Sequence, residues 1–175
     1  MPALNLFRRD GRGTAAIEFA VIAPVLIFLI LGTFEVGRFV RAAMRVSGAA
    51  SNLADLVAQQ TAVTTSNMAN FCTGSQMTLT PLSTASFKAA VASVTYSKAG
   101  TRASDWQDTT CGTATAMANQ VTLATPLTPT KGDSAIVVTA TYTYTLAFAT
   151  VFAKSVTITR IAFARPRAGT TITHS

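Results

Sequence analysis

The sequence predicts an α+β protein, in which a long amino-terminal helix crosses a membrane and then packs on a small antiparallel β-sheet. Three observations carry this prediction. An uncharged apolar run extends from Phe19 to Phe34, and a helical spacing of apolar residues continues to about Gln60. Two segments near the carboxyl terminus, 136–146 and 156–163, alternate as strands do. Together they indicate a helix whose first half lies in lipid and whose second half supports a sheet.

These features divide the chain into three parts. Residues 1–13 form a basic leader, residues 14–60 a transmembrane and extended amphipathic helix, and residues 61–175 a β-rich domain outside the cytoplasm. A chain of 175 residues leaves room for one small domain beside such a helix.

The apolar run is the predicted membrane anchor. With residues 14–18 it reaches the roughly 20 residues that span a bilayer. A cleaved secretory signal is the alternative, but the apolar core is longer than usual and no small-residue cleavage site follows it. Pro24 lacks an amide hydrogen and should loosen the helix, which neighbouring helices tolerate in a bilayer. We therefore favour an anchor that remains in the protein.

Beyond the run, apolar residues keep the spacing of one helical face, which predicts that the helix leaves the membrane and packs on something in water. They are Val36, Val40, Ala43, Val46, Ala50, Leu53 and Val57.

The remaining segment is rich in Thr, Ser and Ala and is expected to be the exposed domain. Ile136–Leu146 alternates apolar residues with a threonine-rich solvent face, and Val156–Phe163 is close enough to pair with it antiparallel. Weaker strand candidates are Gln76–Thr80, Ser93–Ser97 and Gln120–Ala124, and Thr84–Ala92 is a candidate short helix.

The net charge of +7 does not indicate a nucleic-acid partner. The 14 basic residues are scattered along the chain and form no dense stripe interleaved with aromatic residues. Several flank the apolar run, as arginines do beside a membrane span.

The two cysteines, Cys72 and Cys111, lie in the polar half and predict a disulfide outside the cytoplasm, with two unpaired cytosolic thiols as the alternative. A metal site is not expected, because two cysteines cannot complete a tetrahedral sphere and His174, the only histidine, is at an end that we expect to fray. Arginines are balanced on the two sides of the span, so only the disulfide favours an amino terminus inside.

The residue inventory argues against an enzyme. Beyond the helix the acids are Asp105, Asp108 and Asp133, and no pattern pairs a nucleophile with a base or cradles a phosphate. Asp105 and Asp108 are expected to be loop or turn residues. We predict no catalytic residue, no cofactor and no small-molecule substrate.

Glu18 opens the apolar run, where a carboxylate is costly: roughly 3 kcal/mol at the bilayer centre and less near its edge. Cleavage after Gly13 would leave an ammonium on Thr14 that could neutralise Glu18 of the same or an adjacent chain and fix the register of assembling subunits. The alternative is that Glu18 only reaches the headgroups.

The segment RRDGRGTAAIEFAVIAPVLIFLILGTFEVGR resembles the TadE-like domain, and its glycine, four residues and Glu-Phe resemble the prepilin-peptidase site of type IV pilins. The fitting positions are Arg9, Asp10, Gly13, Ala15, Ala16, Glu18, Phe19, Ala20, Pro24, Gly32, Glu35, Gly37 and Arg38.

This resemblance implies a pilin-like fold and a minor pseudopilin or assembly protein of a tight-adherence (Flp) pilus. Its partners would be the bacterial inner membrane, a prepilin peptidase, and other pilus assembly proteins and pilins. Its carboxyl-terminal domain would lie in the periplasm or in an extracellular pilus. A non-polymerising, membrane-anchored binding or scaffold module, similar to TadG, is the alternative.

Overall fold

The computed structural model describes residues 12–147, 154–167 and 171–175. Contacts within the chain separate two compact units, Met1–Arg38 and Phe39–Ser175. Arg8, Arg9 and Asp10 of the predicted leader lie outside the described residues.

The first described element is the helix α2, Arg12–Ala58, which includes Pro24. The apolar run and the amphipathic segment after it therefore form one helix, as the sequence predicts. Apolar residues and alanine, which are compatible with a helix, make up most of its length. It contains no second proline and no run of glycines that would break it.

The second unit is built on a four-stranded antiparallel sheet in the order β3-β2-β4-β5. Its strands are β2, Phe87–Tyr96; β3, Arg102–Cys111; β4, Ser134–Thr145; and β5, Ser155–Ala164. Both strands predicted near the carboxyl terminus are confirmed, and they pair antiparallel from Ile136 with Ala164 to Thr145 with Ser155. The fold is α+β and pilin-like, as predicted.

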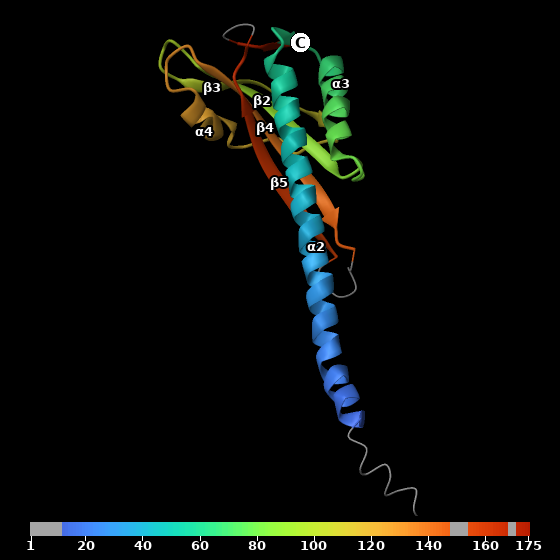
Figure 1. Ribbon diagram of the computed structural model, residues 1–175. Helices are drawn as coiled ribbons and strands as arrows, with labels where there is room; N and C mark the ends of the chain where they lie inside the picture. The colour runs from blue at the N-terminus through green and yellow to red at the C-terminus, as the bar shows by residue number, and fades with distance from the viewer. Residues whose placement is uncertain (1–11, 148–153, 168–170) are drawn as a thin grey trace, which may run out of the picture. The chain divides into compact units, whose positions relative to one another are not determined.

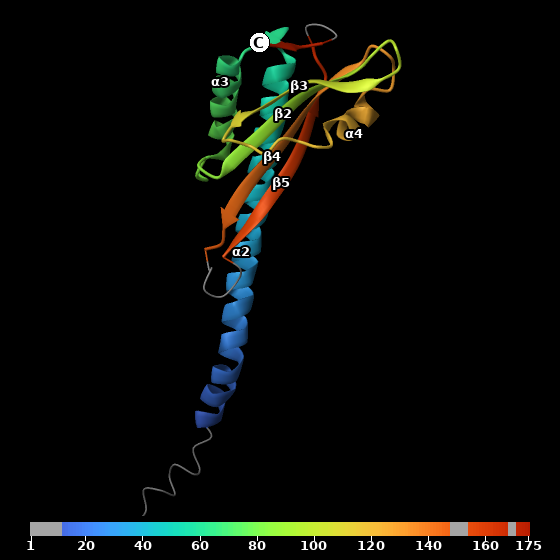
Figure 2. The same cartoon turned by 180° about the vertical axis from the view of Figure 1, so that it is seen from behind.

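The main core lies between the sheet and the second half of α2, which cross each other in both views of the molecule (Figures 1 and 2). Small side chains dominate the helix side of this core, and Ala49, Ala50 and Ala54 are completely buried. On the sheet side, β4 contributes alternate residues from Ile136 to Tyr144. Tyr142 is among them, and burial raises the pKa of its phenol above the ordinary value. The alternation of β4 therefore positions one face on the helix.

The opposite face of the sheet is partly covered by a second, smaller core. The short helix α4, Gln120–Ala124, and the 3-10 turn Thr125–Leu127 lie over it. Met117 and Ala124 pack there against Ala92 and Val137. The threonine-rich face of β4 is exposed only toward the end of the strand, at Thr143 and Thr145.

Two further elements complete the main core. The helix α3, Thr65–Gln76, begins with a capping box between Thr64 and Asn67 and buries Met68 and Cys72. The short strands β1, Ala62–Val63, and β6, Thr173–His174, pair in parallel. The end of the chain is therefore bound to the segment that follows α2.

Three of the weaker secondary-structure predictions are wrong. Gln76–Thr80 contains the 3-10 helix Met77–Leu79, and Gln120–Ala124 contains α4 rather than a strand. The predicted helix Thr84–Ala92 is largely strand, because β2 begins at Phe87. The strand predicted at Ser93–Ser97 is the second half of β2. Short apolar runs do not distinguish a buried strand from a helix.

Candidate functional site

The amino-terminal half of α2 exposes large apolar side chains. Phe19, Val21 and Ile30 are each about two-thirds exposed, at 67%, 70% and 67%. By length and composition α2 is able to cross a membrane, and it is the one such helix among the described residues. Exposed side chains of this kind around a helix are typical of a surface that faces lipid.

The residues of the predicted cleavage site lie in the first turn of this helix. Gly13 and Thr14 are helical and exposed, and Glu18 follows one turn later, also exposed. Residues at positions i and i+4 lie on the same side of a helix, so Thr14 and Glu18 lie one above the other. Cleavage after Gly13 would leave an ammonium on Thr14, and this placement fits a charge pair between that ammonium and Glu18. The charge pair stays a prediction.

The other motif residues lie within and beyond the apolar run. Pro24 is inside the helix, and Glu35, although charged, is only 5% exposed. The Arg38 guanidinium lies 5.8 Å from the centre of the Phe34 ring, a distance typical of a cation–π contact. A Cβ added at Gly37 would meet nothing within 4 Å, so packing within this chain does not explain a glycine there.

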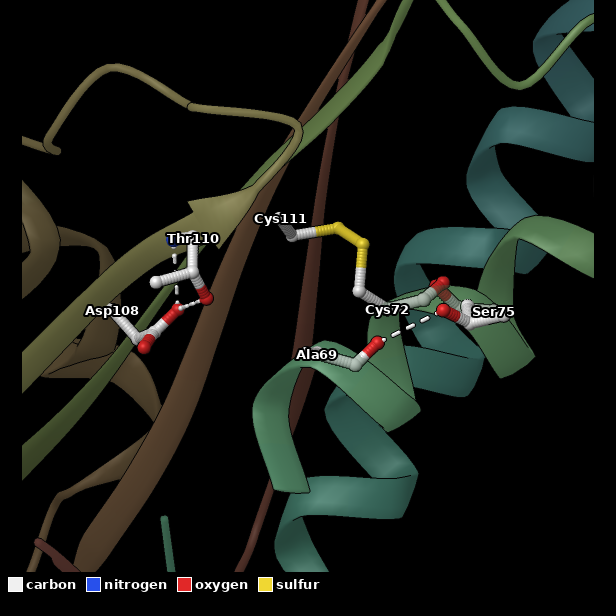
Figure 3. Close-up of a disulfide and its surroundings, with 7 residues drawn as sticks. Ala69, Cys72, Ser75, Asp108, Thr110 and Cys111 are labelled. Carbon is white, nitrogen blue, oxygen red and sulfur yellow. Dashed lines mark hydrogen bonds between the residues drawn. A yellow bond between two sulfur atoms is a disulfide. The ribbon is translucent and has the colours of Figure 1, made fainter. Parts of the chain in front are cut away.

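The predicted disulfide is present. Cys72 of α3 is bonded to Cys111 at the end of β3, with 5.5 Å between their Cα atoms (Figure 3). Both residues are buried in the main core. The disulfide therefore ties α3 to an edge strand of the sheet, a link that stabilises a small domain.

The acids beyond the helix serve structural contacts. Asp105 accepts hydrogen bonds from Ser93 and Thr95 across the sheet, the shorter at 2.6 Å. Asp133 accepts a hydrogen bond from the backbone of Thr130. Asp105 lies on β3 rather than in a loop or turn, and the same is true of Asp108, so that expectation is wrong for both residues.

Asp108 forms the most developed polar cluster. Thr110 donates both its backbone N–H and its hydroxyl to Oδ1, and the His174 ring lies 3.3 Å from Oδ2. The Thr110 hydroxyl bonds the carboxylate and not the imidazole, so this cluster lacks the hydroxyl–imidazole hydrogen bond of a catalytic triad.

The prediction that His174 lies at a frayed end is also wrong. It belongs to β6, and its ring lies 5.1 Å from that of Trp106, whose indole N–H donates to the carbonyl of Ile172 at 2.6 Å. Ile172 is 2% exposed. The one sequence signal for this anchoring is that Ile172, an apolar residue, stands among polar residues at the chain end. Within the described residues, no group of three or more His, Cys, Asp or Glu could hold a metal ion.

Comparison with known proteins finds a similar family for the helix α2 alone. Residues 13–55 match the sequence model of a family described as TadE-like protein. No curated protein and no solved structure is significantly similar to the chain. The matched residues contain the predicted cleavage site and the motif positions described above, from Gly13 to Arg38.

Proposed function

We propose, from the match of residues 13–55 to the TadE-like family, that the chain is a minor pseudopilin or assembly protein of a tight-adherence (Flp) pilus. Family membership supports an association with the Tad pilus machinery. The protein would act by assembly and not by catalysis. Other pilins and pilus assembly proteins would be its partners, and a prepilin peptidase would process it.

The distribution of exposed and buried residues along α2 is the observation that supports this proposal. One uninterrupted helix has an exposed apolar first half and a second half that forms part of the domain core. In such a pilin-like arrangement the same helix anchors the subunit in lipid and supports its folded domain. When subunits assemble, the exposed apolar half offers a surface for neighbouring helices, which can replace the lipid around it.

We place the helix in the inner membrane with the domain in the periplasm. The buried Cys72–Cys111 disulfide supports this orientation, because disulfides persist in oxidising compartments. Cytosolic thiols would remain reduced.

Cleavage between Gly13 and Thr14 is the step that separates the two candidate roles. A processed chain would begin with an ammonium four residues before Glu18, and the pair could be satisfied within a chain or between adjacent chains. A TadG-like membrane-anchored scaffold needs neither the cleavage nor the pair.

The proposal is tested by the intact mass of the protein from its native membrane, with and without the prepilin peptidase, followed by amino-terminal sequencing. We expect a peptidase-dependent chain that begins at Thr14. A chain that retains residues 1–13 in both strains would contradict a processed pseudopilin and favour the anchored scaffold. The variant Gly13→Leu should block processing, whereas Gly48→Ala, a glycine change further along the helix, should leave it unchanged.

A further inference from the structure

The four-stranded sheet has two edge strands, and one of them is irregular and partly covered. The strand β3 contacts both α3 and β6, and the Cys72–Cys111 disulfide ties its end to α3. Its pairing with β2 also shifts register twice. Covering elements and bulges are common means by which proteins keep a sheet edge from pairing with another chain. The β3 edge is therefore a poor template for a further strand.

The opposite edge, β5, is long and regular. Its ten residues, Ser155–Ala164, include no proline and pair with β4 without a shift of register. Within the part of the chain that the structure describes, β4 is its one strand neighbour, and no backbone hydrogen bond joins β5 to another element. Every second residue of an edge strand points its N–H and C=O away from the sheet, so about five residues of β5 offer these groups to a further strand.

Apolar side chains lie along the same strand on the face that points away from the main core. Ile158 and Ala162 are buried in that core, so the residues that alternate with them point to the opposite face. Ile161 and Phe163 are among these, and they are 44% and 42% exposed. A strand added beside β5 would cover part of both side chains, because neighbours on one face of a sheet lie in contact.

The β5 edge carries cations and no acid. Lys154, Arg160 and Arg165 are spaced along residues 154–167, a stretch without aspartate or glutamate. None of the three forms an ion pair within the described residues. Arg160 donates to the carbonyl of Thr159 at 3.0 Å, and Arg165 donates to that of Leu127 at 2.7 Å. Carbonyl acceptors are neutral, so the positive charge of this edge has no carboxylate beside it.

We propose that the β5 edge binds an extended segment of another protein, which pairs antiparallel with β5 and places carboxylates opposite its cations. In strand addition of this kind, main-chain hydrogen bonds give affinity and the alternating side chains give specificity. Charge complementarity identifies the acidic character of the partner, since opposite charges on paired strands stabilise the pair. Strand addition at this edge depends on the folded domain alone and is independent of the pilus assignment.

A second copy of this chain is a poor partner for the same edge. In a symmetric antiparallel pair centred on β5, Lys154 of each copy would lie opposite Arg165 of the other. A shift by one residue would place Arg160 opposite itself. Like charges that face each other across paired strands are destabilising. The cations therefore disfavour self-association and leave the edge available to an acidic strand.

Fluorescence anisotropy with a labelled synthetic peptide, ETVTVETVTVTE, tests this proposal on the full chain in a non-ionic detergent. In the antiparallel register its three glutamates fall opposite Arg165, Arg160 and Lys154. We expect saturable binding that is at least about tenfold tighter than that of the matched lysine peptide, KTVTVKTVTVTK. Absence of saturable binding by the glutamate peptide would overturn the proposal.

Two controls separate strand pairing from attraction to a basic protein. The peptide ETVTVETPTVTE keeps the three glutamates but has a proline that removes a ladder hydrogen bond, so its binding should be lost. Arg160→Glu should weaken binding of the glutamate peptide at least fivefold, and Arg160→Gln should weaken it less. Lys98→Glu makes the same change of charge at an exposed position between β2 and β3 and should leave binding unchanged. Equal binding of the proline peptide, or equal effects of Arg160→Glu and Lys98→Glu, would contradict the proposal.

Hydrogen exchange locates the bound peptide. With the glutamate peptide at about ten times its Kd, the outward amides of residues 155–164 should exchange roughly tenfold more slowly, because they are exposed only in the unbound fraction. Amides of β3, at the other edge, should exchange as they do in the unbound protein. Slower exchange in β3 with no change in residues 155–164 would place the peptide at the wrong edge and overturn the proposal.

Discussion

At the scale of single residues, Trp106 is the group that fixes the carboxyl-terminal strand. Its indole donates to the Ile172 carbonyl at 2.6 Å, and its ring lies beside His174. Ile172 fills part of the main core. This arrangement could not be predicted from the sequence, because Trp106 and Ile172 are far apart in the chain. No local pattern marks a long-range bond of this kind.

We expect Trp106→Phe to lower the free energy of unfolding by about 1–2 kcal/mol, because the buried carbonyl of Ile172 loses its donor. The urea midpoint of the full chain in detergent, followed by circular dichroism, measures this change. Tyr96→Phe, which keeps the ring on which Arg102 lies, is the control and should shift the midpoint by less than about 0.5 kcal/mol. An unchanged midpoint for Trp106→Phe would show that the indole bond does not stabilise the chain end.

At the scale of elements, secondary structure could be predicted from the sequence wherever an element has one apolar and one polar face. The alternation of β4 and β5 was readable because one face packs on α2 and much of the other carries threonines. β2 was misread in its first half because Ala89–Ala92 is buried on both faces, one against α2 and the other under α4. Such a strand has no alternation to detect.

Two other elements were missed because their patterns are weak. β3 is an edge strand of mixed, partly exposed residues, and α3 is a polar helix with few buried positions. Their places are set by the disulfide and by pairing with β2, which are tertiary effects. The candidate site, by contrast, lies in one continuous helix, so its residues could be proposed from local sequence alone, and their roles stay predictions.

The alanine-rich face of α2 yields a prediction for the element. Ala50 is completely buried between the helix and the sheet, whereas Ser51 is exposed on the next position. Ala50→Leu should destabilise the domain by about 1–3 kcal/mol, because the added methyl groups overpack the core. The same change at the exposed site, Ser51→Leu, should be nearly neutral, and thermal unfolding of the two variants compares them directly. Equal melting temperatures would contradict close packing at Ala50.

At the scale of the whole molecule, one covalent link joins distant parts of the domain. The disulfide connects α3, which follows α2, to the edge strand β3 across 39 positions of sequence. Its chain-entropy contribution is about 4 kcal/mol, a large share of the stability of a small domain. Cys72→Ala/Cys111→Ala should therefore lower the free energy of unfolding by about that amount.

Reduction supplies an independent check of this value. A reducing agent should bring the native chain to the urea midpoint of the double alanine variant and leave the variant unchanged. If the native chain kept its midpoint after complete reduction, the stability of the domain would come from its core alone.

Glu18 connects the residue scale to the function of the whole molecule, because the two candidate roles predict opposite outcomes for its replacement. Glu18→Leu makes the start of the span more apolar, so insertion into the membrane should be preserved. A pseudopilin that needs the carboxylate to meet the ammonium of Thr14 should nevertheless lose incorporation into the pilus, and Glu18→Asp, which keeps the charge, should retain much of it. The measurement is the ratio of protein in sheared pili to protein in the membrane fraction. If Glu18→Leu reaches sheared pili as the native chain does, Glu18 is not the assembly charge and its carboxylate only lies among the headgroups. If the variant accumulates in the membrane and is absent from pili, the same helix is shown to anchor the subunit by its apolar surface and to specify assembly by one charge.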